Sequence, residues 1–288
     1  MSSMKVLVTG ASGMLATDLI PCLRNRGYEV LALSHQELDI TNEGSVKNTV
    51  ADFRPNMIFN CAAYTEVDQA ENEQSLADMV NGFAVRNLCL ACNEHDVTLV
   101  HFSTDYVFDG TKEGPYTIHD LPNPINAYGR SKRVGERYVL DMLSKFYIVR
   151  TSGLFGLAGR NFVDNIISLG KAHGEVFVVT NEKGCPTWTR HLAQAVVGLV
   201  DNERYGIYHV TNSGETTRYG FAAEIFRLSG MDVKMTAITA VDFARPAKRP
   251  SNSVLASDPL PQVLGRQMPH WREALEEYLN LRKERAKA

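Results

Sequence analysis

The sequence predicts an α/β fold, a Rossmann-type parallel sheet with helices on both faces and a smaller C-terminal substrate-binding lobe. Short apolar segments of strand length alternate with longer helical patterns through about residue 155. The first of these segments runs into a glycine-containing turn that opens a helix. Small and polar residues follow the third and fourth segments, which is where a parallel sheet binds its ligands.

Composition excludes several classes of protein. The chain has 288 residues, 44% of them apolar, which is enough for a large core. Its net charge is −3, and no lysine and arginine run appears before the last few residues, so we expect no nucleic-acid partner. No apolar run approaches the ~18 residues of a membrane helix and no signal-peptide pattern is present, so we expect a cytoplasmic protein without a membrane partner. The five cysteines are scattered through apolar stretches, which predicts reduced thiols and no metal site.

The first strand, residues 5–8, leads into a turn that contains Gly10 and Gly13, followed by a helical pattern to about residue 26. Gly10 permits a tight turn, and Gly13 lets the backbone approach a pyrophosphate, whose charge the start of a helix favours. The spacing is G-x-x-G-x-x-A, with Ala16 in the third position, where a small residue suits close helix packing. The motif indicates a dinucleotide site, and an ordinary glycine turn is the alternative.

The second strand, residues 29–33, ends at Ser34 and His35 without a carboxylate. An acidic side chain there would bind a ribose 2′-hydroxyl and repel a 2′-phosphate. Its absence leaves NADP(H) permissible as the cofactor and does not exclude NADH. Asp39 and Ile40 come shortly afterwards, and they either line the adenine site or simply begin a turn.

A helix at 43–53 leads to the third strand at 57–60. Small residues follow at 61–65, and at the carboxyl end of a parallel strand they leave room for a cofactor, although they also suit a crowded turn. A long helix is expected over 76–94 and the fourth strand over 98–103. This order of elements predicts a parallel sheet covered on both faces.

Three side chains near the end of the fourth strand suggest acid–base chemistry. In a helix over 128–142, Tyr128 and Lys132 stand at i and i+4 on one face. A neighbouring ammonium favours the phenolate and brings a tyrosine closer to useful acidity. The hydroxyl of Thr104 would then hold a carbonyl oxygen while Tyr128 protonates it. The alternative is a tyrosine packed at a helix start with a solvated lysine one turn later.

Beyond this helix the regular alternation weakens. Further helices are expected at 162–173, 190–200, 219–228 and 271–281. Further strands are expected at 147–151, 176–179 and 206–210, with loops at 181–190 and 243–253. We expect residues 1–155 to form an NAD(P)-binding domain and 156–288 mainly a substrate-binding lobe. The later strands at about 175–180 and 206–210 are expected to join the first domain's sheet.

Several motifs, taken together in order, resemble the extended short-chain dehydrogenase/reductases and, within them, the dTDP-4-dehydrorhamnose reductase family. They are the turn at 9–16, Asp39-Ile40-Thr41, residues 61–68, Ser103-Thr104-Asp105-Tyr106-Val107-Phe108, and Tyr128 with Lys132. The likeness covers nearly the whole chain and includes residues 184–187 and 249–253. The ordered set is more specific than any one of its motifs.

The resemblance implies roles for individual residues. Tyr128 would donate the proton, Lys132 would tune it and hold the nicotinamide ribose, and Thr104 would contact the substrate oxygen. Asn81 matches the position of a proton-relay asparagine. The cofactor would contact Tyr128, Lys132, Gly10, Ser12, Gly13, Met14, Leu15, Asp39, Ile40, Ala62, Ala63, Tyr64 and Thr65. The nucleotide sugar would contact Val67, Thr104, Asp105 and Arg249, since an arginine fork suits phosphate.

One position departs from the family pattern. The reductases usually carry an aromatic residue two positions after the Arg-Thr that ends the strand, where it packs against the sugar. Here Arg150 and Thr151 are followed by Ser152 and then Gly153. Trp188 is not assumed to replace that ring.

The resemblance implies NADPH-dependent reduction of the C4 ketone of dTDP-4-dehydro-6-deoxy-L-mannose to dTDP-L-rhamnose. Mg²⁺ at a subunit contact and a homodimer enter by resemblance alone. One alternative is another nucleotide-sugar reductase or an epimerase. A dehydratase is disfavoured because Tyr106 follows Asp105, where those enzymes usually place a second carboxylate. The other alternative is a non-catalytic regulatory subunit that binds a dinucleotide.

Overall fold

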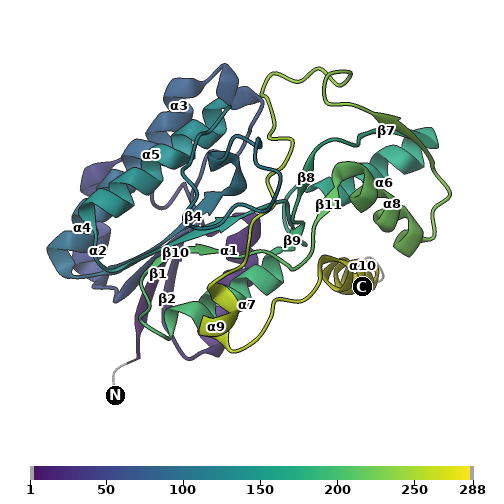
Figure 1. Cartoon of the computed structure of the whole chain (residues 1–288). Coiled ribbons are helices and arrows are strands. Elements are labelled where there is room, and N and C mark those ends of the chain that lie inside the picture. The colour runs from purple at the N-terminus through teal and green to yellow at the C-terminus, as the bar shows by residue number, and fades with distance from the viewer. Residues whose placement is uncertain (1–2, 286–288) are drawn as a thin grey trace.

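The computed structural model describes residues 3–285 and confirms the predicted fold class (Figure 1). Its centre is a six-stranded sheet in the order β10-β5-β4-β3-β1-β2, in which every neighbouring pair is parallel. The strands are β1 Lys5–Thr9, β2 Glu29–Leu33, β3 Met57–Asn60, β4 Thr98–Thr104, β5 Phe146–Thr151 and β10 Gly206–His209. The carboxyl ends of all six strands therefore lie at the same end of the sheet, which we call its carboxyl edge.

Helices cover both faces of this sheet, as Figure 1 shows. Neighbouring side chains of β1 separate the two layers, since Val6 packs into one apolar cluster and Leu7 into the other. The Leu7 face carries α2 Glu43–Phe53, α4 Ala84–His95 and α5 Ala127–Met142. The Val6 face carries α1 Met14–Asn25, α7 Thr189–Val200 and α9 Leu260–Leu264.

The long helix expected at 76–94 is not continuous. It consists of α3 Gln74–Asp78, a π-helical turn Met79–Phe83, and α4. Such turns are often found at functional sites. Here it contains Asn81, whose side chain is almost completely buried.

The second lobe has its own apolar core around Trp188 and Trp271, packed between three helices. These are α6 Phe162–His173, α8 Arg218–Ser229 and α10 Trp271–Arg285. Three two-stranded sheets complete the lobe: β7 Glu175–Val179 with β12 Lys234–Ile238, β8 Lys183–Gly184 with β11 Thr216–Thr217, and β6 Leu154–Phe155 with β9 Thr187–Trp188.

Two expectations about the later strands have different outcomes. The strand expected at 206–210 does join the large sheet, as β10 beside β5. The strand at 175–180 does not, so that expectation was wrong. β7 instead pairs with β12 and buries Val176 and Val178 in the core of the second lobe, so its apolar side chains are covered there.

The expected loop at 181–190 holds the short strands β8 and β9, and β12 and α9 were not expected at all. Within residues 3–285, none of the helices combines the length and apolar character needed to cross a bilayer.

Candidate active site

Side chains from separate parts of the sequence meet at the carboxyl edge of the central sheet. Gly10 follows β1, Cys61 follows β3, and Thr104 ends β4. The first turn of α5, with Tyr128, lies against the segment that follows β4. This is the edge at which parallel sheets of this kind bind ligands.

The turn after β1 requires glycine. Gly10 has φ +65°, and a Cβ there would lie 2.6 Å from the backbone nitrogen of Ala62. Gly13 is the N-cap of α1, has no side chain to cap the helix, and precedes a first turn without acidic residues. The backbone nitrogen of Gly13 donates to Gly10 O at 2.9 Å and closes the turn, so the N–H groups that can face an anion are those of the uncapped first turn of α1.

The neighbouring residues of this turn have different roles. The half-buried Met14 side chain lies against Gly156 and Gly159. Leu15 packs into the core below the sheet, so only its backbone is available to a ligand. The glycine cradle and the uncapped helix start fit a dinucleotide diphosphate.

A carboxylate lies at the end of β2 and belongs to Glu37, three residues after Ser34. The Glu37 carboxylate accepts hydrogen bonds from the Ser34 backbone nitrogen at 2.8 Å and the Ser34 hydroxyl at 2.7 Å. The Asp39 carboxylate is engaged in a turn, accepting from Thr41 N at 2.9 Å and Thr41 Oγ1 at 2.8 Å. The side chain of Ile40 is buried in the core and is therefore not available to a ligand.

Asn81 fixes the segment that follows β3. Its Oδ1 accepts from Tyr64 N at 2.9 Å, and its Nδ2 donates to Tyr64 O at 3.0 Å and to Ser131 Oγ at 2.9 Å. The side-chain amide therefore ties the backbone of residues 62–65 to α5. Ala62, Ala63 and Tyr64 are half-buried, and Thr65 is exposed.

The start of α5 is pinned beside β4. Asn126 caps it by accepting from Gly129 N at 2.7 Å. A Cβ on Gly129 would lie 2.1 Å from the carbonyl oxygen of Tyr106, so glycine permits the close approach. As a result Tyr128 packs edge-on against Tyr106, with ring centroids 6.1 Å apart.

Thr104 lies just before Tyr106, and its hydroxyl takes part in two hydrogen bonds. Its Oγ1 donates to Asp105 Oδ1 at 2.9 Å and accepts from Tyr106 N at 3.1 Å. The buried Asp105 also accepts from Ser152 Oγ at 2.8 Å. Burial raises the pKa of Asp105, and hydrogen bonds from Ser253, Ser152 and Thr104 partly offset that rise.

The electrostatics of Tyr128 and Lys132 differ from the simple expectation. Burial raises the pKa of Tyr128, the charge of Asp105 adds to the rise, and the Thr104 hydroxyl opposes it. Among the described residues, the groups that act on this phenol are Asp105, Thr104 and Tyr106 rather than Lys132. Burial lowers the pKa of Lys132 to about 8, against the opposing effects of Glu136 and Cys61. In the protein alone, Tyr128 is therefore a protonated donor.

The guanidinium of Arg249 already has partners within the protein. Its Nη2 bonds Asp68 Oδ2 at 2.6 Å, and its Nη1 contacts Asp68 Oδ1 and donates to Ala247 O at 2.7 Å. The half-buried Val67 precedes this aspartate. Sequence reasoning singled out Arg249 as a candidate substrate contact but missed its carboxylate partner.

Two further arginines were not singled out as site residues. Arg245 pairs with Glu182, and Arg218 lies 3.8 Å from the same carboxylate. Arg218 Nη2 also lies 3.4 Å from the Tyr106 hydroxyl. No sequence motif marks Arg218, because folding alone brings the start of α8 to this place.

The departure at Gly153 is not compensated by Trp188, which is buried in the core of the second lobe. Gly153 has φ +56°, and a Cβ there would lie 3.3 Å from the Cys185 carbonyl oxygen.

In residues 3–285, no group of three or more His, Cys, Asp or Glu side chains is placed to hold a metal, so Mg²⁺ is not supported.

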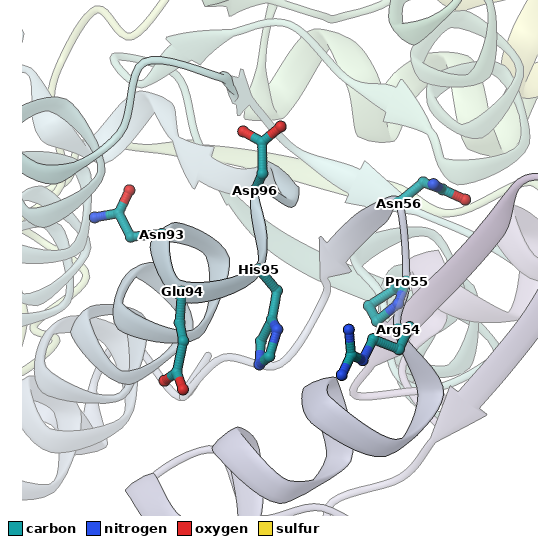
Figure 2. A pocket seen from close by; sticks show the side chains of 7 residues that line it. All are labelled: Arg54, Pro55, Asn56, Asn93, Glu94, His95 and Asp96. Carbon is teal, nitrogen blue, oxygen red and sulfur yellow. The ribbon is translucent and has the colours of Figure 1, made fainter.

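A separate hollow of about 410 Å³ lies at the opposite edge of the sheet (Figure 2). Its lining comes from the loops just before β3 and β4, where Figure 2 shows Arg54, His95 and Asp96. Because it lies at the amino ends of these strands, it is not part of the site around Tyr128.

A parallel sheet with a glycine cradle and a threonine, tyrosine and lysine at its carboxyl edge defines a dinucleotide-binding protein of the short-chain dehydrogenase/reductase class. The family model described as RmlD substrate binding domain matches residues 4–283. The chain belongs to this RmlD family.

Three relatives illustrate the family. A dTDP-4-dehydrorhamnose reductase of Streptomyces griseus is 44% identical over 278 residues, covering 94% of this chain and 91% of the relative. A dTDP-4-keto-6-deoxy-D-glucose reductase of Streptomyces niveus is 42% identical over 271 residues, covering 93% and 94%. The structure of dTDP-4-dehydrorhamnose reductase from Bacillus anthracis in complex with NADP is 38% identical, with a TM-score of 0.93 and coverage of 96% and 99%.

Proposed function

We propose that the protein is an NADPH-dependent dTDP-4-dehydrorhamnose reductase. It would reduce the C4 ketone of dTDP-4-dehydro-6-deoxy-L-mannose to dTDP-L-rhamnose, in nucleotide-sugar and cell-surface polysaccharide biosynthesis. The observation that carries the proposal is that Thr104 ends β4 and Tyr128 packs on the adjoining Tyr106, at the end of the parallel sheet where the glycine turn follows β1, in a chain similar over nearly its whole length to such reductases.

In this proposal NADPH supplies a hydride when bound, and the side chains supply the proton and its positioning. Tyr128 delivers its phenolic proton to the ketone oxygen as negative charge develops there. Thr104 turns its hydroxyl from Asp105 to that oxygen. Lys132, with a pKa of about 8, keeps most of its positive charge at neutral pH and would hold the nicotinamide ribose.

The diphosphate of the sugar nucleotide is proposed to bind among Arg218, Arg245 and Arg249. In the protein alone these cations face the carboxylates of Glu182 and Asp68. A diphosphate would exchange with those carboxylates as the anionic partner. Asp105, with Ser152 beside it, would bind sugar hydroxyls.

Residues 1–155 are proposed as mainly cofactor-binding and 156–288 as mainly substrate-binding, although β10 returns to the first sheet.

A homodimer is proposed as well. Its support is an apolar face on α3 and the π-helical turn, where Leu76, Met79 and Phe83 are 46%, 45% and 47% exposed. A cytoplasmic location remains a prediction from composition.

The function is tested by replacing Tyr128 with phenylalanine. Tyr128→Phe should lower kcat by about a hundredfold or more, because the proton donor is lost, while NADPH affinity changes little. Cofactor oxidation and NADPH fluorescence titration measure the two effects. Tyr138→Phe, on the same helix and packed against Phe83, is the matched control and should retain activity.

A panel of dTDP-, UDP- and GDP-linked 4-keto-sugars, each with NADPH and NADH, identifies the substrate and the preferred cofactor. Turnover with UDP or GDP sugars alone would contradict the rhamnose assignment and keep the chemistry. Turnover with another dTDP-4-keto-sugar would favour the second candidate, a related 4-ketoreductase. That candidate is supported by the Streptomyces niveus relative and by Gly153.

A further inference from the structure

The main chain after β2 holds the Glu37 side chain at the carboxyl end of that strand. Glu37 Oε2 accepts from the Ser34 backbone nitrogen at 2.8 Å and from the Ser34 hydroxyl at 2.7 Å. The backbone turns back over Ser34, because the nitrogens of Glu37 and Leu38 both donate to Ser34 O, at 3.1 and 2.9 Å. The Leu38 side chain is buried in the core and anchors this turn. The position of Glu37 therefore does not depend on the hydrogen bonds of its carboxylate alone.

This turn adjoins the glycine turn after β1. Ala11 of the glycine turn donates its backbone N–H to the carbonyl oxygen of Leu33, the last residue of β2, at 3.0 Å. Ser34, which binds the Glu37 carboxylate, follows Leu33 directly. In a sheet of this kind the adenosine ribose of a dinucleotide binds at the end of the second strand, where a carboxylate bonds its hydroxyl groups. The fold thus brings to this position the acidic side chain that Ser34 and His35 do not provide.

The Glu37 side chain is exposed, and only one of its two oxygens is engaged. Among the described residues, Ser34 alone acts on this carboxylate, through two hydrogen bonds that both go to Oε2. These bonds, from the backbone first and then from the hydroxyl, lower the pKa of Glu37 below its ordinary value, so the group is ionised at neutral pH. Oε1 is therefore a charged acceptor that is available to a ligand.

The surrounding segment does not supply a cation to offset this charge. Residues 34–41 contain no lysine or arginine, and they carry a second carboxylate, that of Asp39. His35 is the one basic side chain of the segment, and its Nδ1 lies 3.9 Å from Asp39 Oδ1. A phosphate placed at the end of β2 would therefore meet acidic side chains without an arginine or lysine from the same segment to bind it.

We propose that Glu37 sets the preference of the protein between NADH and NADPH. Its available oxygen accepts a hydrogen bond from the 2′-hydroxyl of the adenosine ribose of NADH. The same negative charge repels the 2′-phosphate of NADPH. The inference rests on the proposed function and extends it: NADH serves as a cofactor as well, and Glu37 lowers the preference for NADPH.

Titration of cofactor fluorescence measures the Kd of NADH and of NADPH without any substrate. Glu37→Gln keeps the size of the side chain and removes its charge. The Kd of NADPH should fall about fivefold, because the repulsion is lost, and the Kd of NADH should rise about threefold, because a charged acceptor becomes neutral. The ratio of the two constants should therefore shift by about tenfold or more towards NADPH.

Glu29→Gln is the matched control, because it removes the same charge from the amino end of the same strand. Glu29 is exposed and lies 3.8 Å from the Lys5 ammonium. It is roughly 13 Å along the strand from Leu33, which is farther than the Debye length of ~8 Å at physiological ionic strength. Its ratio of Kd values should stay within about twofold of the wild type.

An NADH analogue that lacks the 2′-hydroxyl of the adenosine ribose tests the contact itself. The wild type should bind NADH about tenfold more tightly than this analogue, and in Glu37→Gln the factor should fall to about threefold or less. The wild-type comparison needs no variant, so it decides the contact even where a variant does not fold. Equal affinity of the wild type for NADH and the analogue would overturn the proposal, and so would the same factor in a folded Glu37→Gln.

The cofactor preference has its own contradicting outcomes. An unchanged ratio in Glu37→Gln, or a shift of equal size in Glu29→Gln, would show that Glu37 does not set the preference. A gain in NADPH affinity without any change for NADH would also overturn the proposal, because the carboxylate would then exclude a phosphate without holding a hydroxyl. Thermal denaturation of both variants confirms that the compared proteins are folded.

These titrations distinguish failure of the inference from failure of the proposed function. A wild type that binds both dinucleotides as expected but reduces no keto-sugar would refute the proposed function and leave the role of Glu37 intact. A wild type that reduces the keto-sugar with an unchanged cofactor preference in Glu37→Gln would refute only the inference. A wild type that binds neither dinucleotide would refute both.

Discussion

At the scale of single residues, glycines and short polar side chains determine how closely segments approach one another at the site. Gly10 admits the backbone of Ala62, and Gly129 admits the carbonyl of Tyr106. Asn81 and Asn126 then fix these contacts with hydrogen bonds to backbone atoms. The reacting side chains thus depend on residues that do no chemistry themselves.

Gly10→Ala should destabilise the protein by at least about 2 kcal/mol and weaken NADPH binding. Alanine is strained at φ +65°, and its methyl group would lie 2.6 Å from Ala62 N. Urea denaturation and NADPH titration measure the two effects. Gly27→Ala is an informative control, because Gly27 also has positive φ but a Cβ there meets nothing within 4 Å. Equal loss of NADPH affinity in both variants would show that strain, not the approach to Ala62, governs cofactor binding.

The sequence predicted the residues of this site better than their contacts. Tyr128, Lys132 and Thr104 follow from spacing on a helix and from the end of a strand, which are local patterns. The pairing of Arg249 with Asp68 joins residues 181 positions apart, and no local pattern could indicate it. The raised pKa of Tyr128 depends on burial and on Asp105, which are known only once the chain is folded.

At the scale of elements, α5 is attached to the sheet by a buried ion pair. Glu136 on α5 bonds Arg150 on β5 with distances of 2.7 and 2.8 Å, and also accepts from Ser103 at 2.6 Å. Both charged side chains are almost completely buried. Since Glu136 is one turn after Lys132, this pair also fixes the register of the proposed catalytic helix.

Glu136→Gln should lower the free energy of unfolding by about 3 kcal/mol, because Arg150 would be left buried without its counter-charge. Asp96→Asn is the control, since the exposed Lys145–Asp96 pair should contribute no more than about 1 kcal/mol. Denaturant titration measures both. A loss no larger than that of the control would show that the pair is not needed to hold α5 on the sheet.

The Glu136–Arg150 pair also makes the free energy of unfolding of the wild-type protein depend on pH. Burial alone would raise the pKa of Glu136, but the hydrogen bond and charge of Arg150 lower it below the ordinary 4.5. The stabilisation is therefore present above that value and is lost as pH falls through the folded-state pKa. Glu136→Gln should lack this part of the acid transition.

Helix and strand positions were largely predictable because hydrophobic periodicity is a local property. Helices α2 and α6 were expected over residues 43–53 and 162–173, as the structure has them. The π-helical turn at Met79–Phe83 was not foreseen, since its sequence fits a continuous α-helix equally well. Short strands such as β8 and β9 were missed because two residues carry no periodicity.

At the scale of the whole molecule, the segment that follows β12 connects the two lobes (Figure 1). Figure 1 shows this yellow-green segment running above the molecule from the second lobe back to the first. It is fastened to the first lobe by Arg249 with Asp68 and by Asn126 Nδ2, which donates to Lys248 O at 2.8 Å. Substrate and cofactor would therefore meet beneath a segment that contacts both lobes.

Arg249→Ala should raise KM for the nucleotide sugar about tenfold or more and change the KM for NADPH by no more than about twofold. Steady-state kinetics measure both constants, and Arg227→Ala, an exposed cation on α8, is the control. The variant Asp68→Asn distinguishes phosphate binding by Arg249 from the bridging of the two lobes by the Arg249–Asp68 ion pair. If it raises the sugar KM as much as Arg249→Ala does, the ion pair between the lobes, and not a phosphate contact, is what Arg249 provides.

The return of β10 to the central sheet has a consequence for the order in which the protein can be completed during synthesis. Until residue 209 has left the ribosome, β5 has an unpaired edge, and the Val6 face lacks α9 until residue 264 has followed. Such an edge is open to pairing with other chains. The nascent protein therefore depends on its second half to protect its first, and the two lobes must mature together.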